Sequence, residues 1–346
     1  MNRLRSWRAA GSCAAWMVAM LALLAPGAEA AATPVGLQTD PAIQEYSPAA
    51  TATYEAWEQD SVASPNTWNV YAQPRAGSAS WKVNARNTQG YVPRPVTGGN
   101  ESIIYTQQTS RTSGLFIYNL AAKVRTALPA KVDSAAWNYS GVASTKYIAF
   151  MRLTSTTREL LLYNRSSGKV TQVTTTKRSC SSCLQPTWVG ATHLAYDTCS
   201  ATTSACNSHV LTIGGAAVTV PRAPAPHSVY GAAVDEATGN VYFVSSTTWC
   251  GLFVSVERWN LAGGAPSDLY DLPEGFDIFS GISLAPDTST PGNLDALYSQ
   301  YDCIAENYDN YALESANTLL KITTHAPAAA PATGAPRRTR PPVPPS

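Results

Sequence analysis

A short apolar strand core that ends in an aromatic residue recurs six times along the chain, and this repeat constrains the fold more than any other feature. The aromatic residues lie 48, 45, 46, 47 and 55 residues apart. They are Trp57, Tyr105, Phe150, Tyr196, Phe243 and Tyr298. A period in the forties that is filled with short strands and turns is typical of a β-propeller blade. The sequence therefore predicts an all-β fold, a six-bladed β-propeller with four-stranded antiparallel blades.

The strands of a blade are clearest in the third repeat. From the inner to the outer edge we expect them at residues 134–138, 146–153, 158–163 and 169–174, with Ser167-Gly168 in the turn between the last two. Matching segments give the inner strands of all six blades. They are expected at residues 43–47, 91–97, 134–138, 186–190, 230–235 and 279–284.

The two ends of the repeat indicate how the ring closes. The sixth repeat runs through residues 317–324 and ends one strand short of a complete blade. Residues 45–47 match residues 138–140, so that the first blade begins at residue 43 and residues 34–39 are left over. We expect residues 34–39 to be the outer strand of the sixth blade, because this pairing removes an exposed sheet edge. The alternative is a flexible leader.

Several short motifs of the repeat resemble those of a known family. The third repeat contains Trp137-Asn-Tyr-Ser-Gly141, Ile148-Ala-Phe150 and Leu162-Tyr163-Asn164, and the sixth contains Ser283-Leu-Ala-Pro-Asp287. These segments are similar to the repeat of TolB-type propellers, which reads roughly Trp-Ser-Pro-Asp-Gly, then Ile-Ala-Phe, then an apolar Leu-Tyr pair. The resemblance covers most of residues 34–324. It implies a periplasmic or surface-exposed binding scaffold rather than an enzyme, an analogy that comes from the fold.

The two ends of the chain have compositions that differ from the repeat. Arg3, Arg5 and Arg8 precede an apolar run over residues 13–25 and then small residues up to Ala30. This pattern predicts a signal peptide at residues 1–30, cleaved near Ala30, and a secreted or periplasmic protein. Residues 326–346 are almost entirely Ala, Pro, Thr, Gly and Arg, which predicts a disordered tail, typical of a bacterial protein. The propeller is then expected at residues 31–325.

Charge and composition exclude several functions. The formal charge is +1, but without the six arginines of the two ends and Glu29 the chain has 18 basic and 22 acidic residues. No basic stripe is present, which argues against a nucleic-acid partner. No second apolar stretch is long enough to span a membrane, and no glycine-rich phosphate loop suggests a nucleotide. We expect a monomer without a cofactor or a metal site.

The cysteines indicate a stapled surface. Six remain after cleavage of the signal peptide, and an even number in an exported chain favours disulfides. All six fall in links between blades or in loops between second and third strands, which share one face of a propeller. We expect three pairs on this cysteine-rich loop face, Cys199 with Cys206, Cys250 with Cys303 and Cys180 with Cys183, although other pairings remain open. A redox role for the last pair lacks a thioredoxin-like context.

The cysteine-rich loop face also carries the candidate binding residues. Residues 301–311 read Tyr-Asp-Cys-Ile-Ala-Glu-Asn-Tyr-Asp-Asn-Tyr and are expected to form a loop. Tyrosines beside acids and amides suit contact with a sugar or a protein. The candidate binding residues are Trp249, Tyr301, Glu306, Tyr308, Asp309, Tyr311 and His227. The alternatives are a solvated loop and a calcium loop, but the regular alternation of a calcium loop is missing.

Three functions remain open. The first is a non-enzymatic binding protein or scaffold of the cell envelope or the medium, which recognises a protein or glycan through the cysteine-rich loop face. The second is a secreted polysaccharide hydrolase or lyase whose carboxylates meet in the central funnel. Its candidates are Glu45, Asp133, Asp235 and Asp277, none of which the sequence assigns as catalytic. The third is a structural spacer without a ligand.

Overall fold

The computed structural model describes twelve segments of the chain. They are residues 35–38, 43–61, 64–77, 79–110, 112–132, 137–179, 184–203, 205–222, 228–247, 253–286, 294–303 and 307–314. Within these residues the regular structure consists of β-strands and contains no helix. The predicted signal peptide (1–30) and the predicted tail (326–346) lie outside the described residues.

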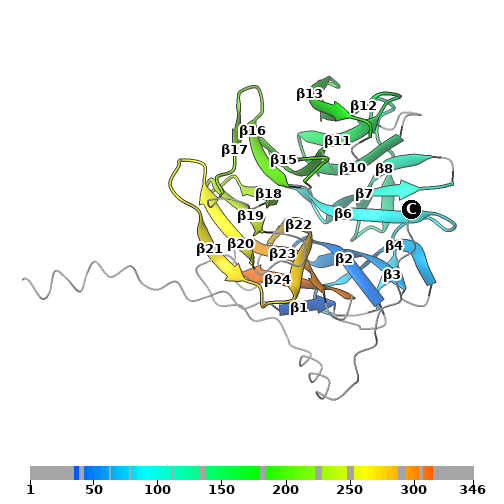
Figure 1. Cartoon of the computed structure of the whole chain (residues 1–346). Coiled ribbons are helices and arrows are strands. Elements are labelled where there is room, and N and C mark those ends of the chain that lie inside the picture. The colour runs from blue at the N-terminus through cyan, green and yellow to red at the C-terminus, as the bar shows by residue number, and fades with distance from the viewer. Residues whose placement is uncertain are drawn as a thin grey trace, which may run out of the picture. The chain divides into compact units, whose positions relative to one another are not determined.

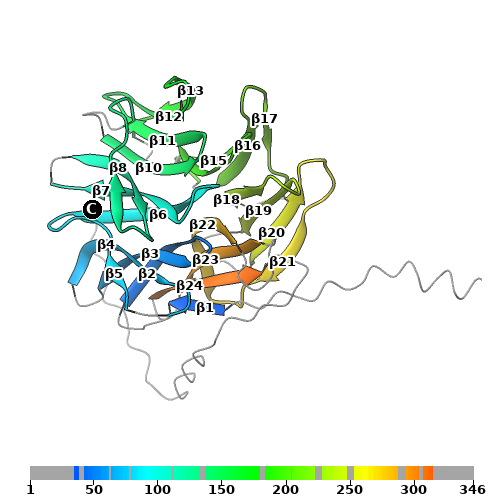
Figure 2. The same ribbon diagram turned by 180° about the vertical axis from the view of Figure 1, so that it is seen from behind.

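The strands form antiparallel four-stranded units, which we call meanders and name by their inner strand (Figures 1 and 2). Three meanders are separate sheets of strands consecutive in the chain. They are β2 (Ile43–Ala50), β3 (Tyr54–Ser61), β4 (Ser64–Pro74) and β5 (Trp81–Lys82); β14 (Leu184–Val189), β15 (His193–Cys199), β16 (Cys206–Thr212) and β17 (Ala217–Thr219); and β18 (Ser228–Asp235), β19 (Asn240–Ser246), β20 (Val254–Asn260) and β21 (Ser267–Asp271).

Two further meanders are joined in one eight-stranded sheet. They are β6 (Gln89–Thr97), β7 (Ser102–Gln108), β8 (Ser113–Asn119) and β9 (Val124–Thr126); and β10 (Trp137–Ser144), β11 (Tyr147–Leu153), β12 (Thr157–Asn164) and β13 (Val170–Lys177). The junction is a short parallel pairing of β6 with β10. The last sheet contains β22 (Phe276–Pro286), β23 (Leu294–Asp302), β24 (Asn307–Glu314) and β1 (Val35–Gln38).

The inner strands form a closed circuit. In chain order each of β2, β6, β10, β14, β18 and β22 contacts the next, and β22 contacts β2. A ring of antiparallel meanders with their first strands at the centre is a β-propeller, so the predicted all-β propeller fold is confirmed. The predicted number of six blades counts the two halves of the eight-stranded sheet separately, and it stays a prediction.

The N-terminal strand closes the ring as expected. β1 pairs antiparallel with β24, with Val35 opposite Ala312, and covers the outer edge of the β22 meander (Figure 1). The strand that pairs with β1, which is β24, was predicted at the wrong place. The third strand of this meander is β24 at Asn307–Glu314, not residues 317–324, and it pairs with β23 from Asp302↔Asn307 to Asp295↔Glu314. Tyrosines favour a pleated, half-buried strand, so this polar-looking segment extends the sheet.

The third repeat confirms three predicted strands and corrects one. β11, β12 and β13 lie at the predicted places within a few residues, and Gly168 occupies the expected turn with φ +66°. The inner strand β10, however, covers Trp137–Ser144 rather than residues 134–138. A bulge between Tyr139 and Val142 lets the strand continue through Ser140 to Ser144.

A bulge of this kind occurs in five inner strands, of which β22 carries Gly281 (75°). The other four share a further contact with the preceding meander. Each has a shift in register against its neighbour, and at the shift one residue adopts a positive φ. These residues are Ser47 (51°), Val92 (47°), Ser140 (48°) and Gly231 (67°). The predicted match between residues 45–47 and 138–140 is therefore a structural equivalence. A residue in this conformation points its N–H away from its own ladder, and that N–H needs another acceptor.

The acceptor comes from the preceding meander, from the residue that follows the aromatic anchor. The bonds run from Ser47 N to Ser299 Oγ (2.7 Å), from Val92 N to Glu58 Oε2 (2.9 Å), from Ser140 N to Thr106 Oγ1 (3.1 Å) and from Gly231 N to Asp197 Oδ2 (2.8 Å). We call these four contacts the seam bonds. They join sheets that share no ladder at these positions, so they fix each meander against the next.

Apolar packing completes the seams. The aromatic anchors Tyr105, Phe150, Phe243 and Tyr298 are fully buried, and each is near the middle of its sheet. One core cluster includes residues of the β14, β18 and β22 meanders, which shows that the core lies between the sheets. Burying a large aromatic or aliphatic side chain is worth about 1.5–3 kcal/mol. The repeat detected in the sequence is therefore the periodic placement of these buried residues.

Two glycines meet where β18 approaches β22. Gly231 and Gly281 both have positive φ, and a Cβ built on Gly231 would lie 2.1 Å from the Cα of Gly281. Because each glycine meets backbone atoms of the other, no side-chain rotation can relieve this contact. This is the place in the ring where a glycine is required by both conformation and space.

The glycine contact predicts a large effect of a single methyl group. We expect Gly231→Ala to lower the free energy of unfolding by about 2–5 kcal/mol, because strain at positive φ adds to the backbone clash. Gly214→Ala is the matched control, since Gly214 has φ +88° but nothing within 4 Å of the added methyl group, and it should lose only about 1–2 kcal/mol. Urea denaturation measures both, and equal losses would contradict the close contact.

The seam bonds also predict a pH dependence. Burial raises the pKa of Glu58 from 4.5 to about 7, against the opposing hydrogen bond from Val92, and burial likewise raises the pKa of Asp197 to about 6. The folded protein therefore holds protons that the unfolded chain releases, and stability falls as pH rises through these values. Glu58→Gln keeps an acceptor for Val92 without a charge.

We expect Glu58→Gln to flatten the decline in the free energy of unfolding between pH 4.5 and about 7, the ordinary and the folded pKa of Glu58. Glu159→Gln is the control, because it removes the same charge from a half-buried position on β12 outside the seams. Chemical denaturation across this pH range is the measurement. A decline as steep in Glu58→Gln as in the unmodified chain would show that Glu58 is ionised throughout.

Candidate functional site

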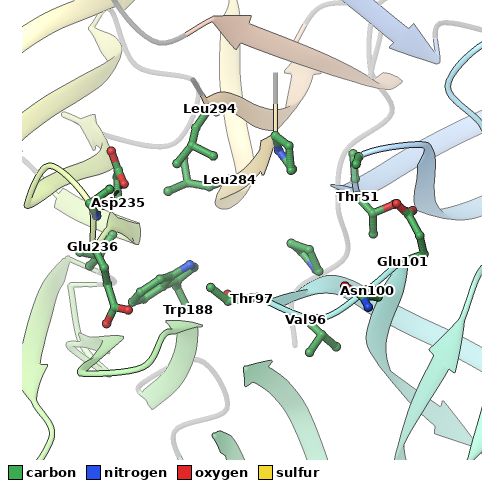
Figure 3. A pocket seen from close by; sticks show the side chains of 18 residues that line it. Thr51, Val96, Thr97, Asn100, Glu101, Trp188, Asp235, Glu236, Leu284 and Leu294 are labelled. Atoms are coloured by element: carbon green, nitrogen blue, oxygen red, sulfur yellow. Dashed lines mark hydrogen bonds between the residues drawn. The ribbon is translucent and has the colours of Figure 1, made fainter. Parts of the chain in front are cut away.

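A cavity of about 580 Å³ opens at the ring centre, at the ends of the inner strands where these turn into the second strands (Figure 3). Its lining comes from the ends of β2, β6, β18 and β22, from β14 and from the start of β23. We call it the central pocket. Short turns bring these strand ends close together, so residues far apart in the sequence share one cavity.

The floor of the central pocket is apolar. Trp188 contributes its indole ring while only 7% of the residue is exposed, and Leu284 and Leu294 lie across from it (Figure 3). Val96 and Val234 add branched side chains from two further sheets. Such a floor accepts an apolar group and offers it little hydrogen bonding.

The rim of the pocket carries carboxylates. Figure 3 shows Asp235 and Glu236 on one side and Glu101 on the other. Asp235 accepts the N–H of Ala237 at 3.0 Å, and the Thr51 hydroxyl donates to Glu101. These bonds hold the acids in place at the turns, so the negative charge around the opening is fixed in position.

Glu236 is the most extensively bonded of the rim carboxylates. Its Oε1 accepts the N–H groups of Thr192 (2.7 Å) and His193 (2.9 Å), and its Oε2 accepts that of Ala191 (2.8 Å). Partial burial works against ionisation, but these backbone bonds outweigh it and lower the pKa of Glu236. The ionised side chain therefore ties the β18–β19 turn to the β14–β15 turn beside the pocket.

Gly190 makes this part of the rim compact. A Cβ at Gly190 would lie 2.3 Å from the indole ring of Trp188 and 2.5 Å from the carboxyl carbon of Glu236. The absence of a side chain lets Trp188 and Glu236 approach each other across the backbone. The apolar floor and the acidic rim are therefore in direct contact.

Inside the ring lie further ionisable groups. Burial lowers the pKa of Arg94 to about 10, against the opposing charges of Glu58 and Asp197. Burial is also the main cause that raises the pKa of Tyr230, whose hydroxyl donates to Asp277 at 3.4 Å and to the carbonyl of Ile278 at 2.7 Å. Glu58 and Asp197 hold the seam bonds, so this cluster serves the structure of the ring.

The two described carboxylates among the enzyme candidates do not meet. Asp235 lies at the end of β18 beside the central pocket, whereas Asp277 lies near the start of β22, which is the opposite end of an inner strand. The side chain of Glu45 and the whole of Asp133 lie outside the described residues. The two described candidates are therefore not paired across one site.

The described residues among the binding candidates of the sequence are not part of the central pocket's lining. Tyr301 is half-buried near the end of β23, and the backbone of Tyr308, Asp309 and Tyr311 belongs to β24 rather than to a loop. Only residues 303–306 separate these two strands. Trp249, His227 and Glu306 lie outside the described residues, and their role in binding stays a prediction.

One predicted disulfide is confirmed. Cys199 and Cys206 are bonded and face each other across the β15–β16 hairpin. Cys303 is also disulfide-bonded, and its predicted pairing with Cys250 stays a prediction. Cys180, Cys183 and Cys250 lie outside the described residues.

A metal-ligand cluster and a membrane-spanning helix are both absent from the described part of the chain. Among these residues no group of three or more His, Cys, Asp or Glu side chains could hold a metal ion. None of them forms a helix of the length and apolarity needed to cross a membrane.

Sequence reasoning missed the central pocket. Its residues come from the ends of strands and from the turns beside them, and they share no motif that the chain repeats. The available signal was weak: in several repeats the inner strand runs directly into a polar turn, as in Asp235-Glu236 and Thr97-Gly-Gly-Asn100. The cavity depends on how five sheets converge, which no single segment encodes.

Comparisons with known proteins agree on the fold. No protein-family model matches the chain, and no curated protein matches its sequence. A protein of unknown function from Dyadobacter fermentans is similar with a TM-score of 0.53 and 8% identity, over 82% of this chain and 98% of that one. TolB from Acinetobacter baumannii is similar with a TM-score of 0.49 and 12% identity, over 87% of this chain and 69% of that one.

An oligogalacturonate lyase in complex with manganese is similar with a TM-score of 0.47 and 10% identity, over 82% of this chain and 96% of that one. At these identities the likeness concerns the fold alone. The neighbours include TolB and other β-propeller proteins, and the resemblance to TolB-type propellers found in the repeat is confirmed at the level of fold.

Proposed function

We propose that this chain is an exported, non-enzymatic, six-bladed β-propeller that binds a polypeptide in its central pocket. The observation that carries this proposal is the combination of an apolar floor with an acidic rim at the ring centre. Trp188 and Leu284 would receive an apolar side chain of the ligand. Asp235, Glu236 and Glu101 would attract a lysine or arginine next to it.

The size of the pocket supports a polypeptide segment. Ligand pockets typically enclose about 300–1,000 Å³, and 580 Å³ accommodates one large side chain together with neighbouring backbone. A sugar would leave the aliphatic groups of Val96, Val234 and Leu294 without matching contacts. The ligand class that satisfies both floor and rim is therefore a peptide with an apolar residue flanked by a basic one.

Preorganisation supports binding without large rearrangement. Glu236 is held by three backbone N–H groups. Asp235 is held by a backbone N–H of its turn, and Glu101 is held by a threonine hydroxyl. Side chains that are already fixed lose little conformational entropy when a ligand arrives. The same bonds argue against catalysis, because a carboxylate that caps a turn is not available as a nucleophile or general base.

Export and a second contact area complete the proposal. The Cys199–Cys206 disulfide supports an oxidising compartment such as the periplasm or the medium. On the cysteine-rich loop face, Phe253 is 67% exposed at the start of β20, and it could enlarge a contact with a protein partner there. The predicted binding residues of that face remain part of the proposal.

A pocket-filling variant tests the central pocket. Ala237 is exposed and lines the cavity, so Ala237→Trp should obstruct it without removing an existing bond of a side chain. On an array of short peptides, we expect the full chain to select peptides with an apolar residue beside Lys or Arg. Ala237→Trp should weaken the binding of the selected peptides at least about tenfold, which is about 1.4 kcal/mol.

Ala121→Trp is the matched control, because Ala121 is exposed in the β8–β9 turn and lines neither the central pocket nor its rim. A chain that ends at residue 325 is a second control, since it lacks the arginines 337, 338 and 340, which could compete for the acidic rim. The proposal fails if neither the full chain nor the chain that ends at residue 325 selects a peptide. It also fails if the two tryptophan variants bind the selected peptides equally well.

A further inference from the structure

A second cavity, of about 520 Å³, lies at the opposite end of β6 from the central pocket. It is formed by the start of β4, the link from β5 to β6, and the β7–β8 connection. We propose that this cavity, the amide cavity, binds an oligosaccharide. The proposal goes beyond the proposed function, because it concerns another site and another class of ligand.

The lining of the amide cavity is chemically uniform. Four side-chain amides line it, from Asn69, Asn87, Gln89 and Gln108. The other described lining residues are three threonines and a serine, together with Lys82, which is the one charged residue among them. An amide offers donors and an acceptor side by side, which matches the paired hydroxyls of a sugar ring. Among the described residues no carboxylate and no apolar side chain lines the cavity, so neither a cation nor an apolar side chain would find its partners there.

Buried residues hold part of this lining in place. Asp60, which is 3% exposed, accepts both the N–H (3.0 Å) and the hydroxyl (3.1 Å) of Thr67. Asn84, which is 4% exposed, donates to Asn69 Oδ1 at 3.2 Å and to the carbonyl of Thr88 at 2.8 Å. A polar surface supported from beneath in this way is a preorganised site rather than a chance depression.

An aromatic stack supports a third amide. The Tyr91 hydroxyl donates to Gln89 Oε1, and burial followed by the nearby charge of Glu58 raises the pKa of Tyr91, so the hydroxyl remains a donor. The ring of Tyr91 lies 6.3 Å from that of Trp68, which in turn lies 4.8 Å from Tyr46. The packing of these rings fixes the position of Tyr91. The hydroxyl of Tyr91 in turn holds the amide of Gln89 with its oxygen toward that hydroxyl.

Other lining groups are free to bind a ligand. The side chains of Lys82, Asn87 and Gln108 make no hydrogen bond or ion pair with any described residue. The cavity thus combines amides whose positions are fixed with amides whose bonding capacity is unused. Polar groups that a sugar would satisfy are present without a protein partner, and Lys82 can add a bond to a hydroxyl or to a sugar carboxylate.

The amide cavity is separate from the central pocket. Gln89 and Thr97, at the two ends of β6, line one cavity each, and at about 3.3 Å per residue they lie roughly 26 Å apart. A variant that obstructs the central pocket should therefore leave the amide cavity intact. This separation makes the two proposals independently testable.

The test is binding of the full chain to a glycan array that spans neutral, N-acetylated and uronic-acid oligosaccharides, followed by calorimetry with the glycan bound most strongly. We expect Gln108→Ala and Lys82→Ala each to weaken that binding at least about fivefold, the effect of one lost hydrogen bond. Gln172→Ala is the matched control, because Gln172 is an exposed amide on β13 outside the cavity. It should bind like the unmodified chain, as should Ala237→Trp.

Two results would overturn the saccharide site. One is the absence of binding to every glycan class on the array by a chain that melts cooperatively. The other is binding that Gln108→Ala and Lys82→Ala leave unchanged while their melting temperatures match that of the unmodified chain. If instead Ala237→Trp abolishes glycan binding, the sugar occupies the central pocket, and the amide cavity is excluded as its site.

Discussion

The ring depends on a hydrogen bond that crosses from one meander to the next. A four-stranded meander is too thin to bury both of its faces, so it needs its neighbours on either side. The seam bonds set how these neighbours sit, because each joins a bulged N–H of an inner strand to the residue after an aromatic anchor. The bulge also bends the inner strand, and its end then points toward the central pocket.

Among the described residues two seams lack such a bond, and in both the preceding meander offers no side-chain acceptor. Before β14 the residue after the anchor is Met151, which has no acceptor oxygen, and the register of β14 shifts between Pro186 and Trp188. Before β22 the corresponding residue is Val244, and there the backbone of Gly281 packs directly on Gly231. In both seams an apolar side chain thus stands where the other four seams have an acceptor.

The sequence allowed the propeller and its closure by β1 to be predicted, because buried aromatic anchors recur at nearly constant spacing and one strand was missing at the end. It misplaced β24, since Tyr308 and Tyr311 stand among acids and amides that suggest a loop, although they pair with β23 in full register. The central pocket could not be predicted, because its residues come from strand ends and turns of five sheets. Their proximity follows from the curvature of the ring and not from any local pattern.

The contrast between the two cavities follows from which end of the inner strands each occupies. At the turn ends the strands converge on the axis, so Leu284 and Val234 gather there, and acids such as Glu236 are favoured because the turns present unpaired N–H groups. At the other end of β6 the chain crosses between meanders, and its polar backbone is met by neutral amides such as Asn84. The two ends of β6 therefore border an acidic, apolar pocket and a polar, amide-rich one, and a propeller with these two proposed sites can hold a polypeptide and a saccharide at a fixed separation.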